Sequence, residues 1–265
     1  MNIHLATGNN SPLYVPKACP EFALGLDPSV ACFLNSFHCF AAESVLEKNA
    51  VYRLRHKVYC EELNFEPIRE SGMENDSFDT NSIHLGIEHA LSAKMVGTVR
   101  VITSANSQER LPVESNFGNT ITHAELNPAA FQREQICEIS RLAVPDFVRC
   151  KLRSGDMFTD EQQAQSGSLV AISLYLLASV LCEQEGRFHC FVMFEHKMAR
   201  ALRKIGIHFS QVGDFTEYHG LRAVHYLDVR TLNETLKPKY LALRSMLATQ
   251  LDSNSLARLG SKKIA

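Results

Sequence analysis

The chain has 265 residues, of which 45% are apolar, enough to bury one large core. Its 27 Lys and Arg residues are offset by 29 Asp and Glu residues, so the net charge is -2 and no overall field favours nucleic acid or an anionic membrane. Any basic surface for a partner must therefore be local. The eight cysteines include no C-x-x-C pair and the chain does not begin like a secretory signal, so we expect reduced, mostly buried thiols in a cytoplasmic protein.

The N-terminal part of the chain shows a change of pattern near residue 35. Residues 1–34 contain several prolines, glycines and asparagines without periodicity, which predicts an irregular extension. From Asn35 to Leu63 apolar residues recur at three- and four-residue spacing, which predicts a helix. Pro67 and Gly72 then open an acidic loop.

The middle of the chain predicts three strands. Two β-like runs, Ile83 to Ala90 and Met95 to Thr103, are joined by a short polar link that favours a hairpin. A third run, Cys137 to Val144, ends at Pro145. A polar loop then leads to a long apolar helix.

That helix extends from Gly167 to about Glu185, and its most apolar run has only 14 residues (Leu169 to Cys182), too short for the ~20 residues that span a bilayer. A continuous apolar run, Phe188 to Phe194, is typical of a buried central strand. The helix Glu195 to Gly206 follows.

The last predicted elements are the strands His208 to Gly213 and Ala223 to Val229, and an amphipathic helix with a basic tail after Pro238. Antiparallel strands followed by alternating strands and helices indicate a mixed sheet with helices packed on it, an α+β (α/β mixed) fold. We expect one domain over residues 35–235, with a helix and tail over 236–265.

Sharp catalytic motifs are missing from the sequence. No G-x-S-x-G, Walker, G-x-G-x-x-G or H-E-x-x-H motif occurs, which argues against the common hydrolase, NTPase, dinucleotide and zinc sites. The histidines are dispersed, and His219 and His225 lack ligand spacing, so we predict no metal site.

Three charged residues stand inside predicted strands, namely Arg100 in "GTVRVI" and Glu138 and Arg141 in "EISRL". A charge in a buried strand costs several kcal/mol unless it is paired, so these side chains should meet one another or a ligand. One interpretation is a structural ion-pair network with the helix of Arg55, and the other is a ligand pocket.

Glu138 and Arg141 would point to opposite faces of a regular strand, so a shared pocket requires a β-bulge between them. Such a bulge would also free backbone N–H groups for an oxyanion site in acyl transfer.

The acidic stretch "ENDSFD" places Asp76 and Asp79 three residues apart, on one side of a helical turn. A solvated loop or a helix cap is the simpler explanation. Recognition of an ammonium group, aided by the ring of Phe78, is a second explanation, and weak metal binding is a third.

Taken together, these residues resemble the ordered motifs of acyl-homoserine-lactone autoinducer synthases, which belong to the GNAT acyltransferase superfamily. The motifs are "LRHKVY" with Arg55 and Tyr59, Phe65, "DSFD" with Asp76 and Asp79, "GTVR" with Arg100, and "EISR" with Glu138, Ser140 and Arg141. "VYCEELNFEP" and the chain length resemble more closely a sister group, the GNAT acyltransferases associated with the PEP-CTERM/exosortase system and related to N-acyl amino acid synthases.

The resemblance implies a GNAT-like sheet with a splayed strand pair and a β-bulge at the acyl site. It implies catalytic roles for Arg100, Glu138 and Arg141, with Glu138 as the base. It implies substrate-binding roles for Arg55, Tyr59, Phe65, Asp76, Asp79 and Ser140. Tyr59 and Phe65 depart from the Phe and Trp of autoinducer synthases, and the segment after Pro145 lacks the compact turn that binds pyrophosphate in CoA-dependent relatives.

The function implied is transfer of a long-chain acyl group to the amine of a small amino-acid-like acceptor, with no tightly bound cofactor. Acyl carrier protein is the expected donor, and acyl-CoA is the alternative donor. An autoinducer synthase that uses S-adenosylmethionine and a non-catalytic GNAT-like lipid-binding protein are the alternatives. The helix at 167–185 and the strand at 188–194 could wall an acyl tunnel or form ordinary core.

Acyl carrier proteins are acidic, so a local basic surface is expected. Lys197, Arg200 and Lys204 share one face of a helix, with Arg203 beside them. The further candidates for carrier-protein binding lie in the preceding loop: Arg149, Lys151 and Arg153. Ordinary solvated helix charge is the alternative.

Overall fold

The computed structural model describes the backbone of residues 25–149 and 167–261. The predicted N-terminal extension lies outside the described residues up to position 24, and the end of the basic tail lies outside them from position 262. The polar loop before the long apolar helix lies outside them over residues 150–166.

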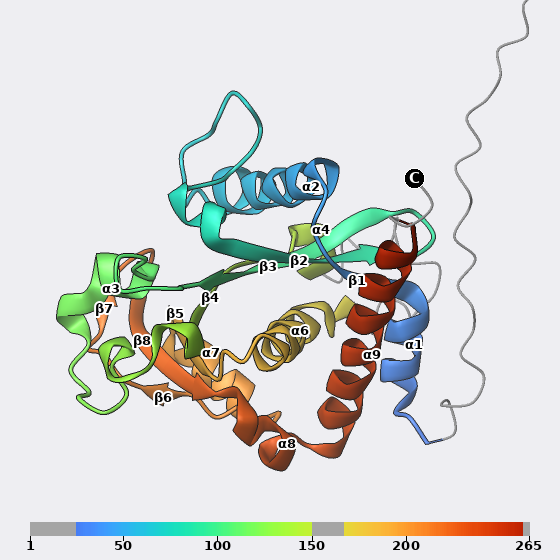
Figure 1. The fold of residues 1–265 in the computed structure, drawn as a ribbon. Helices are drawn as coiled ribbons and strands as arrows, with labels where there is room; N and C mark the ends of the chain where they lie inside the picture. Colours follow the sequence, from blue (N-terminus) through green and yellow to red (C-terminus); the bar gives the residue numbers. More distant parts are fainter. Residues whose placement is uncertain (1–24, 150–166, 262–265) are drawn as a thin grey trace, which may run out of the picture.

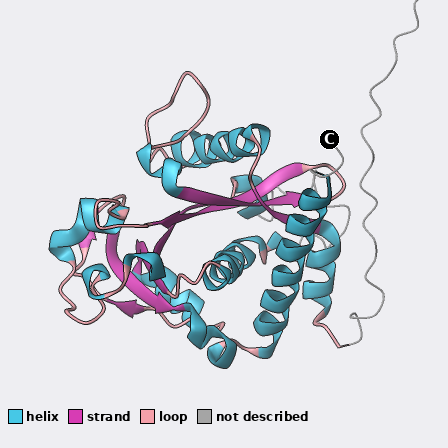
Figure 2. Cartoon of the chain, in the orientation of Figure 1, coloured by secondary structure: helices cyan, strands magenta, loops and turns pink. Residues whose placement is uncertain are grey.

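A sheet of eight strands forms the centre of the molecule, in the order β1-β2-β3-β4-β5-β8-β6, with β7 also paired to β8 (Figures 1 and 2). The strands are β1 (Phe37–Ala41), β2 (Ser82–His89), β3 (Lys94–Thr103), β4 (Ile136–Ala143), β5 (His189–Glu195), β6 (Ser210–Gln211), β7 (Thr216–Glu217) and β8 (Leu221–Asp228). Every neighbouring pair is antiparallel except β4 and β5, which are parallel. The predicted mixed sheet is confirmed.

Helices cover both faces of this sheet. They are α1 (Pro28–Ser36), α2 (Val45–His56), α3 (Pro112–Phe117), α4 (Asp146–Arg149), α6 (Val170–Gln184), α7 (His196–Arg203), α8 (Leu232–Thr235) and α9 (Pro238–Ser261). Figure 1 shows α2 above β2 and β3 and α6 on the opposite side of these strands, with α1 and α9 side by side near β1. No helix among the described residues is long and apolar enough to cross a bilayer.

Alternation along β3 decides which side chains face each helix layer. Val99 and Val101 are buried in the main core together with residues of α6. Gly97 allows α6 to approach closely, because a Cβ atom there would lie 2.9 Å from side-chain atoms of both Val170 and Leu174. Arg100 lies on the opposite face, on the side of α2.

Helix α2 begins with a capping box, in which the hydroxyl of Ser44 accepts the N–H of Glu47 and the Glu47 carboxylate accepts the N–H of Ser44. It continues into one π-helical turn, η1 (Lys57–Glu62), a form that is frequent at functional sites.

The prediction of one helix from Asn35 to Leu63 is wrong in its first part, where β1 pairs with β2. Phe40 packs closely on Gly86, at which a Cβ atom would lie 2.6 Å from the ring. This tertiary contact stabilises a strand although Phe37 and Phe40 have helical spacing.

The prediction of an irregular segment up to residue 34 is also wrong where the structure describes it, because α1 begins at Pro28. Its start carries a recognisable signal, since Asp27 caps the helix and proline occupies the first turn.

The other predicted elements are confirmed within a few residues, except the strand His208 to Gly213, of which only β6 is a strand. The hairpin between β2 and β3 is confirmed. The helices α3 and α4 and the strand β7 were not expected from the sequence.

The strands β4 and β5 are splayed. They pair only where Ile136–Glu138 lie beside His189–Phe191, although β4 continues to Ala143 and β5 to Glu195. Beyond Glu138 the two strands therefore separate, which confirms the splayed pair.

A β-bulge occurs in the separated part of β4. Arg100 of β3 pairs with Ser140 of β4, and Thr98 pairs with Ala143. One residue of β3, Val99, therefore lies opposite two residues of β4, Arg141 and Leu142. Arg141 adopts φ 49°, a left-handed conformation that costs roughly 1–2 kcal/mol for a residue with a side chain. A bulge is therefore present in this strand, but at Arg141 and Leu142, whereas the sequence predicted it between Glu138 and Arg141, where the pairing is regular up to Ser140.

Candidate active site

Three arginines converge on the face of the sheet that carries α2. Arg55 comes from α2, Arg100 from β3 and Arg141 from the bulge of β4. Four carboxylates from the segment between η1 and β2 neutralise them, and we call these seven residues the arginine cluster: Arg55, Arg100, Arg141, Glu66, Glu74, Asp76 and Asp79. With all seven ionised, the cluster carries one excess negative charge.

Arg55 forms the buried base of the cluster. Its Nε donates to Glu74 Oε2 at 2.5 Å, and its Nη1 donates to Asp79 Oδ1 at 2.7 Å. The side chains of Arg55 and Glu74 are both 0% exposed. Removing one partner of such a pair leaves a buried charge uncompensated, which costs about 3–5 kcal/mol.

Arg100 links the same loop to the sheet. Its Nη1 donates to Asp76 Oδ1 at 2.6 Å and to Asp79 Oδ1 at 2.9 Å, while its Nε donates to the hydroxyl of Ser140 on β4 at 3.1 Å. The two aspartates also cap the short helical turn η2 (Ser77–Asn81). Both the cap and the ion-pair network expected from the sequence are therefore present.

Arg141 forms the more exposed edge of the cluster. Its Nη2 lies 2.9 Å from Glu66, 3.2 Å from Glu74 and 3.4 Å from Asp76. The side chains of Arg141, Glu66 and Asp76 are 20%, 22% and 25% exposed, in contrast with the buried pair beneath them. Within the described part of the chain, this edge is where the cluster is open to solvent.

The ion pairs shift the protonation equilibria in the cluster. Burial works to raise the pKa of Asp79, but the hydrogen bond from Arg55 and the charges of Arg55 and Arg100 outweigh it and lower the pKa to about 2. His84 lies 3.6 Å from Asp79, and its burial lowers its pKa to about 4 in spite of that carboxylate. The aspartate is thus charged and the histidine neutral near pH 7.

Tyr59 connects the π-helical turn to the bulge. Its hydroxyl donates to the carbonyl of Leu142 at 2.8 Å, and the guanidinium of Arg141 lies 5.5 Å from the centre of its ring. Burial raises the pKa of this phenol despite the nearby arginines. The ring of Phe65 stacks on that of His219, with 4.6 Å between the ring centres.

Glu138 lies outside the arginine cluster. It is buried on the same face of β4 as Ser140, but one of its carboxylate oxygens accepts the backbone N–H of Val113 at 2.7 Å, at the start of α3. Burial in this largely apolar surrounding raises its pKa to about 8, against the opposing effect of the Val113 hydrogen bond. The side chain is three residues before the bulge, about 10 Å along the strand.

The predicted basic face lies on α7. Lys197, Arg200, Arg203 and Lys204 are exposed and border a groove of about 600 Å³ that also includes Phe209 and His225. Lys197 is held by Glu195 at 2.6 Å. Arg149, on α4, is paired with Glu62 at 2.6 Å. Lys151 and Arg153 lie outside the described residues.

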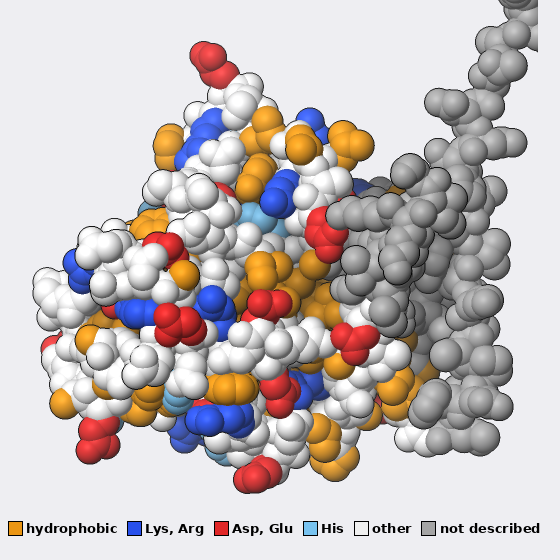
Figure 3. All heavy atoms as spheres, in the orientation of Figure 1, with side chains coloured by type: hydrophobic (Ala, Val, Ile, Leu, Met, Phe, Trp, Pro, Cys, Tyr) orange, Lys and Arg blue, Asp and Glu red, His pale blue; other side chains and the backbone are white. Residues whose placement is uncertain are grey.

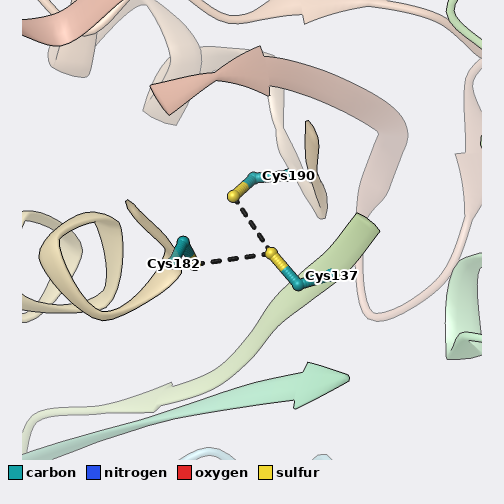
Figure 4. Close-up of side chains that lie close together, drawn as sticks. All are labelled: Cys137, Cys182 and Cys190. Atoms are coloured by element: carbon teal, nitrogen blue, oxygen red, sulfur yellow. Dashed lines mark hydrogen bonds between the residues drawn. The ribbon is translucent and has the colours of Figure 1, made fainter. Parts of the chain in front are cut away.

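A second group of chemically active side chains lies in the main core. Figure 4 shows Cys137 from β4, Cys182 from α6 and Cys190 from β5 pointing toward one another, with Cys137 Sγ at 3.4 Å from Cys182 Sγ and 3.1 Å from Cys190 Sγ. Hydrogen bonds with Cys137 and then with Cys190 lower the pKa of the Cys182 thiol, against the opposing effect of burial. Three sulfurs can ligate a soft metal ion, but these are enclosed in the core, and among the described residues no fourth Cys, His, Asp or Glu side chain joins them. We interpret them as core packing.

Glu66 and Glu74 were not singled out in the sequence, although they complete the cluster. Three arginines, two of them fully buried, require a comparable number of carboxylates, and Asp76 and Asp79 supply only two. That imbalance of charge is the signal that points to further acids in the stretch "EPIRESGME".

Residues 54–159 match the acetyltransferase (GNAT) domain family. The match contains α2 from Leu54 onward, the arginine cluster, β2, β3 and β4. None of the curated proteins is detectably similar to this chain in sequence.

Several solved structures share the fold at low sequence identity. TofI in a ternary complex with an inhibitor and MTA is 15% identical, covers 77% of this chain and 99% of its own, and has a TM-score of 0.56. BjaI, a CoA-dependent acyl-homoserine lactone synthase with SAM and isopentyl-CoA, is 16% identical over 80% of this chain and 89% of its own, with a TM-score of 0.55. FeeM, an N-acyl amino acid synthase from uncultured soil microbes, is 16% identical, covers 77% of this chain and 96% of its own, and has a TM-score of 0.52. The chain has a GNAT-like fold, and the domain match supports an acyl-transferring enzyme.

Proposed function

We propose that this chain transfers a long-chain fatty acyl group from acyl carrier protein to the amine of an amino-acid-like acceptor, giving an N-acyl amino acid. The observation that carries this proposal is the position of the arginine cluster, whose partly exposed edge meets the bulge of β4 at the open end of a splayed strand pair. In a GNAT-like fold, this combination places charged groups beside the strand that would hold the acyl group.

The proposed reaction is an aminolysis of a thioester. The acceptor nitrogen forms a bond to the thioester carbonyl carbon, the carbon–sulfur bond breaks, and the sulfur leaves as the carrier thiol. An ammonium group is not nucleophilic, so a base must first remove its proton. We assign that role to Glu138, because a carboxylate with a pKa of about 8 is basic enough to accept a proton near neutral pH.

Glu138 cannot touch an amine held at the bulge, because it lies three residues deeper in the strand. The proposed proton path therefore passes through water and the hydroxyl of Ser140, which projects from the same face between Glu138 and the bulge. The developing negative charge on the thioester oxygen would be stabilised by backbone N–H groups of the bulge.

We propose two roles for the arginine cluster: its buried part positions the loop between η1 and β2, and its exposed edge binds the substrate. Arg55, Glu74, Asp79 and Arg100 fix the loop over the sheet, and Arg141, Glu66 and Asp76 form the edge that meets the substrate. Tyr59 supports the bulge through Leu142. Phe65 is assigned to the acceptor side, because its ring contacts His219 and Arg222 of the β7–β8 hairpin.

The donor is proposed to be acyl carrier protein, which would dock on the basic face of α7. Figure 3 shows the face of the molecule seen in Figure 1, with hydrophobic side chains gathered across its middle and charged side chains of both signs around them.

The acyl chain of the donor needs an apolar wall, since burial of each CH₂ group contributes about 0.8 kcal/mol to binding. We propose that α6 and β5 wall the site for this chain. An association with the PEP-CTERM/exosortase system stays a prediction.

The test is product analysis with the purified full chain. Acyl carrier protein and CoA loaded with the same fatty acid are each incubated with a mixture of amino acids, and the products are identified by mass spectrometry. An N-acyl amino acid supports the proposal, and a lactone with methylthioadenosine released from S-adenosylmethionine would replace it by the autoinducer-synthase alternative. Bound fatty acid with no amide or lactone would indicate a lipid-binding protein.

Docking on α7 is tested by reversing one charge. Arg200→Glu is expected to weaken the use of acyl carrier protein and leave acyl-CoA turnover unchanged, with the effect smaller at high salt. Lys237→Glu is the matched control, since Lys237 is also exposed but lies outside α7. Equal loss with both donors would contradict docking at this face.

A further inference from the structure

Arg222 lies beside the open end of the splayed strand pair. Its partner on β5 is Glu195, the last residue of that strand. On β5, Glu195 is four residues after Phe191, which lies beside Glu138 of β4. Because side chains alternate along a strand, Arg222 belongs to the same face of the sheet as Glu138.

Every arginine of the cluster has carboxylate partners, whereas the guanidinium of Arg222 has none among the residues that the structure describes. Its Nη2 donates to the carbonyl of His219 at 3.2 Å, while its buried Nε has no acceptor among the described residues. It forms no ion pair with any residue whose side chain the structure describes, since Glu195 is bonded to Lys197 instead. A buried N–H without a protein acceptor is costly, and it is the feature expected of a site for an anionic group.

The same guanidinium is held in place by an aromatic ring. Its central carbon lies 5.5 Å from the centre of the Phe65 ring, and Phe65 stacks on His219 at the tip of the β7–β8 hairpin. A stacked guanidinium loses less conformational freedom when it binds a planar anion.

Two phenols lie within reach of the charge of Arg222. Burial raises the pKa of Tyr59 and of Tyr175, and Arg222 opposes this shift at both. The hydroxyl of Tyr59 is bonded to Leu142, so the charge of Arg222 acts on a residue that contacts the bulge.

We propose that Arg222 binds the carboxylate of the acceptor, which makes the acceptor a free α-amino acid rather than a simple amine. This inference rests on the proposed N-acyl transfer. A guanidinium binds a carboxylate through two parallel hydrogen bonds. In an α-amino acid a single carbon separates the carboxylate from the amine, so an acceptor held at Arg222 presents its nitrogen toward the bulge of β4, where the thioester carbonyl would lie.

The test compares amino acids with their carboxamides as acceptors. The wild-type chain is expected to favour the acid over the amide in kcat/KM. Arg222→Gln should lower kcat/KM for the acid about 10- to 100-fold, chiefly through KM, and leave the amide nearly unchanged. Arg222→Lys should recover only part of the preference, because an ammonium group cannot form the paired hydrogen bonds.

Arg230→Gln is the matched control. Arg230 also stacks on a phenylalanine, with its guanidinium 4.9 Å from the centre of the Phe188 ring, but it is paired with Asp228 at 2.6 Å. It follows β8 directly, beyond the end of the strand opposite Arg222. The control should keep the wild-type preference for the acid, and the thermal midpoint of each variant shows whether it is folded.

The failures of the two proposals give different results. If a folded Arg222→Gln variant loses acid and amide turnover equally, or if the wild type uses both equally, the carboxylate assignment is overturned while N-acyl transfer stands. If the wild type acylates no acceptor of either kind, the proposed function falls and the assignment falls with it.

Discussion

Replacing Glu138 with Gln is expected to stabilise the folded protein at neutral and alkaline pH while removing activity. Burial raises the pKa of Glu138 from 4.5 to about 8. Between these pH values the unfolded chain releases a proton that the folded chain retains, so the free energy of unfolding falls as the pH rises, by up to 1.36 kcal/mol per pH unit. The resulting loss is about 3 kcal/mol at pH 7 and levels off at about 5 kcal/mol above pH 8.

The free energy of unfolding of Glu138→Gln should not fall in this way, because the amide has no proton to release. Its oxygen can still accept the N–H of Val113. Urea unfolding between pH 5 and pH 9 checks the difference. The wild type should become less stable than Glu138→Gln through this range, whereas Glu134→Gln, which changes an exposed acid before β4, should follow the wild type. The rate of amide formation by the wild type should rise with pH up to about 8 and then level off.

Parallel stability curves for the wild type and Glu138→Gln would refute this reasoning. They would mean that the pKa of Glu138 is not raised in the folded chain, so that its carboxylate is a weaker base than the one we propose. A fully active Glu138→Gln variant would remove the base role even if the stability curves behaved as expected.

Three other predictions follow from single contacts. Asp79→Asn should lower the free energy of unfolding by about 3–5 kcal/mol at pH 7, because it leaves the charge of Arg55 partly uncompensated. Urea titration measures this difference. An equal effect at pH 2, where Asp79 is itself half protonated, would contradict this cause. Gly206→Ala should lower the free energy of unfolding by more than about 1 kcal/mol, because Gly206 has φ 103° and the added Cβ would overlap the carbonyl of Thr235. Thermal unfolding measures this loss. An unchanged midpoint would show that the loop can move. The thiols of Cys137, Cys182 and Cys190 should react with an alkylating agent only after the chain is unfolded. Peptide mass spectrometry detects the labelled cysteines. Rapid labelling of the native chain would show that this part of the core opens.

The candidate site was predictable in its parts but incomplete in its contacts. Charged residues inside apolar strands identified Arg100, Glu138 and Arg141, because burial of an unpaired charge is unfavourable in any fold. The alternation of side chains along a strand also indicated a bulge, but the bulge lies at Arg141 and Leu142 and leaves Glu138 outside the arginine cluster. Arg222 carried no such signal, because an arginine near the start of a strand is ordinary in sequence and acquires meaning only from what surrounds it.

The sequence by itself determined the strands and helices with strong periodicity, their order, and the residues whose burial demands a partner. These depend on local spacing and on the cost of isolated charge, which the chain carries wherever it folds. Only the tertiary structure decided that Phe37 begins a strand, that Glu66 and Glu74 complete the arginine cluster, and that Glu138 lies apart from it against α3. Those outcomes depend on contacts between residues far apart in the chain, and the free energy of such contacts exceeds the local preferences that sequence patterns record.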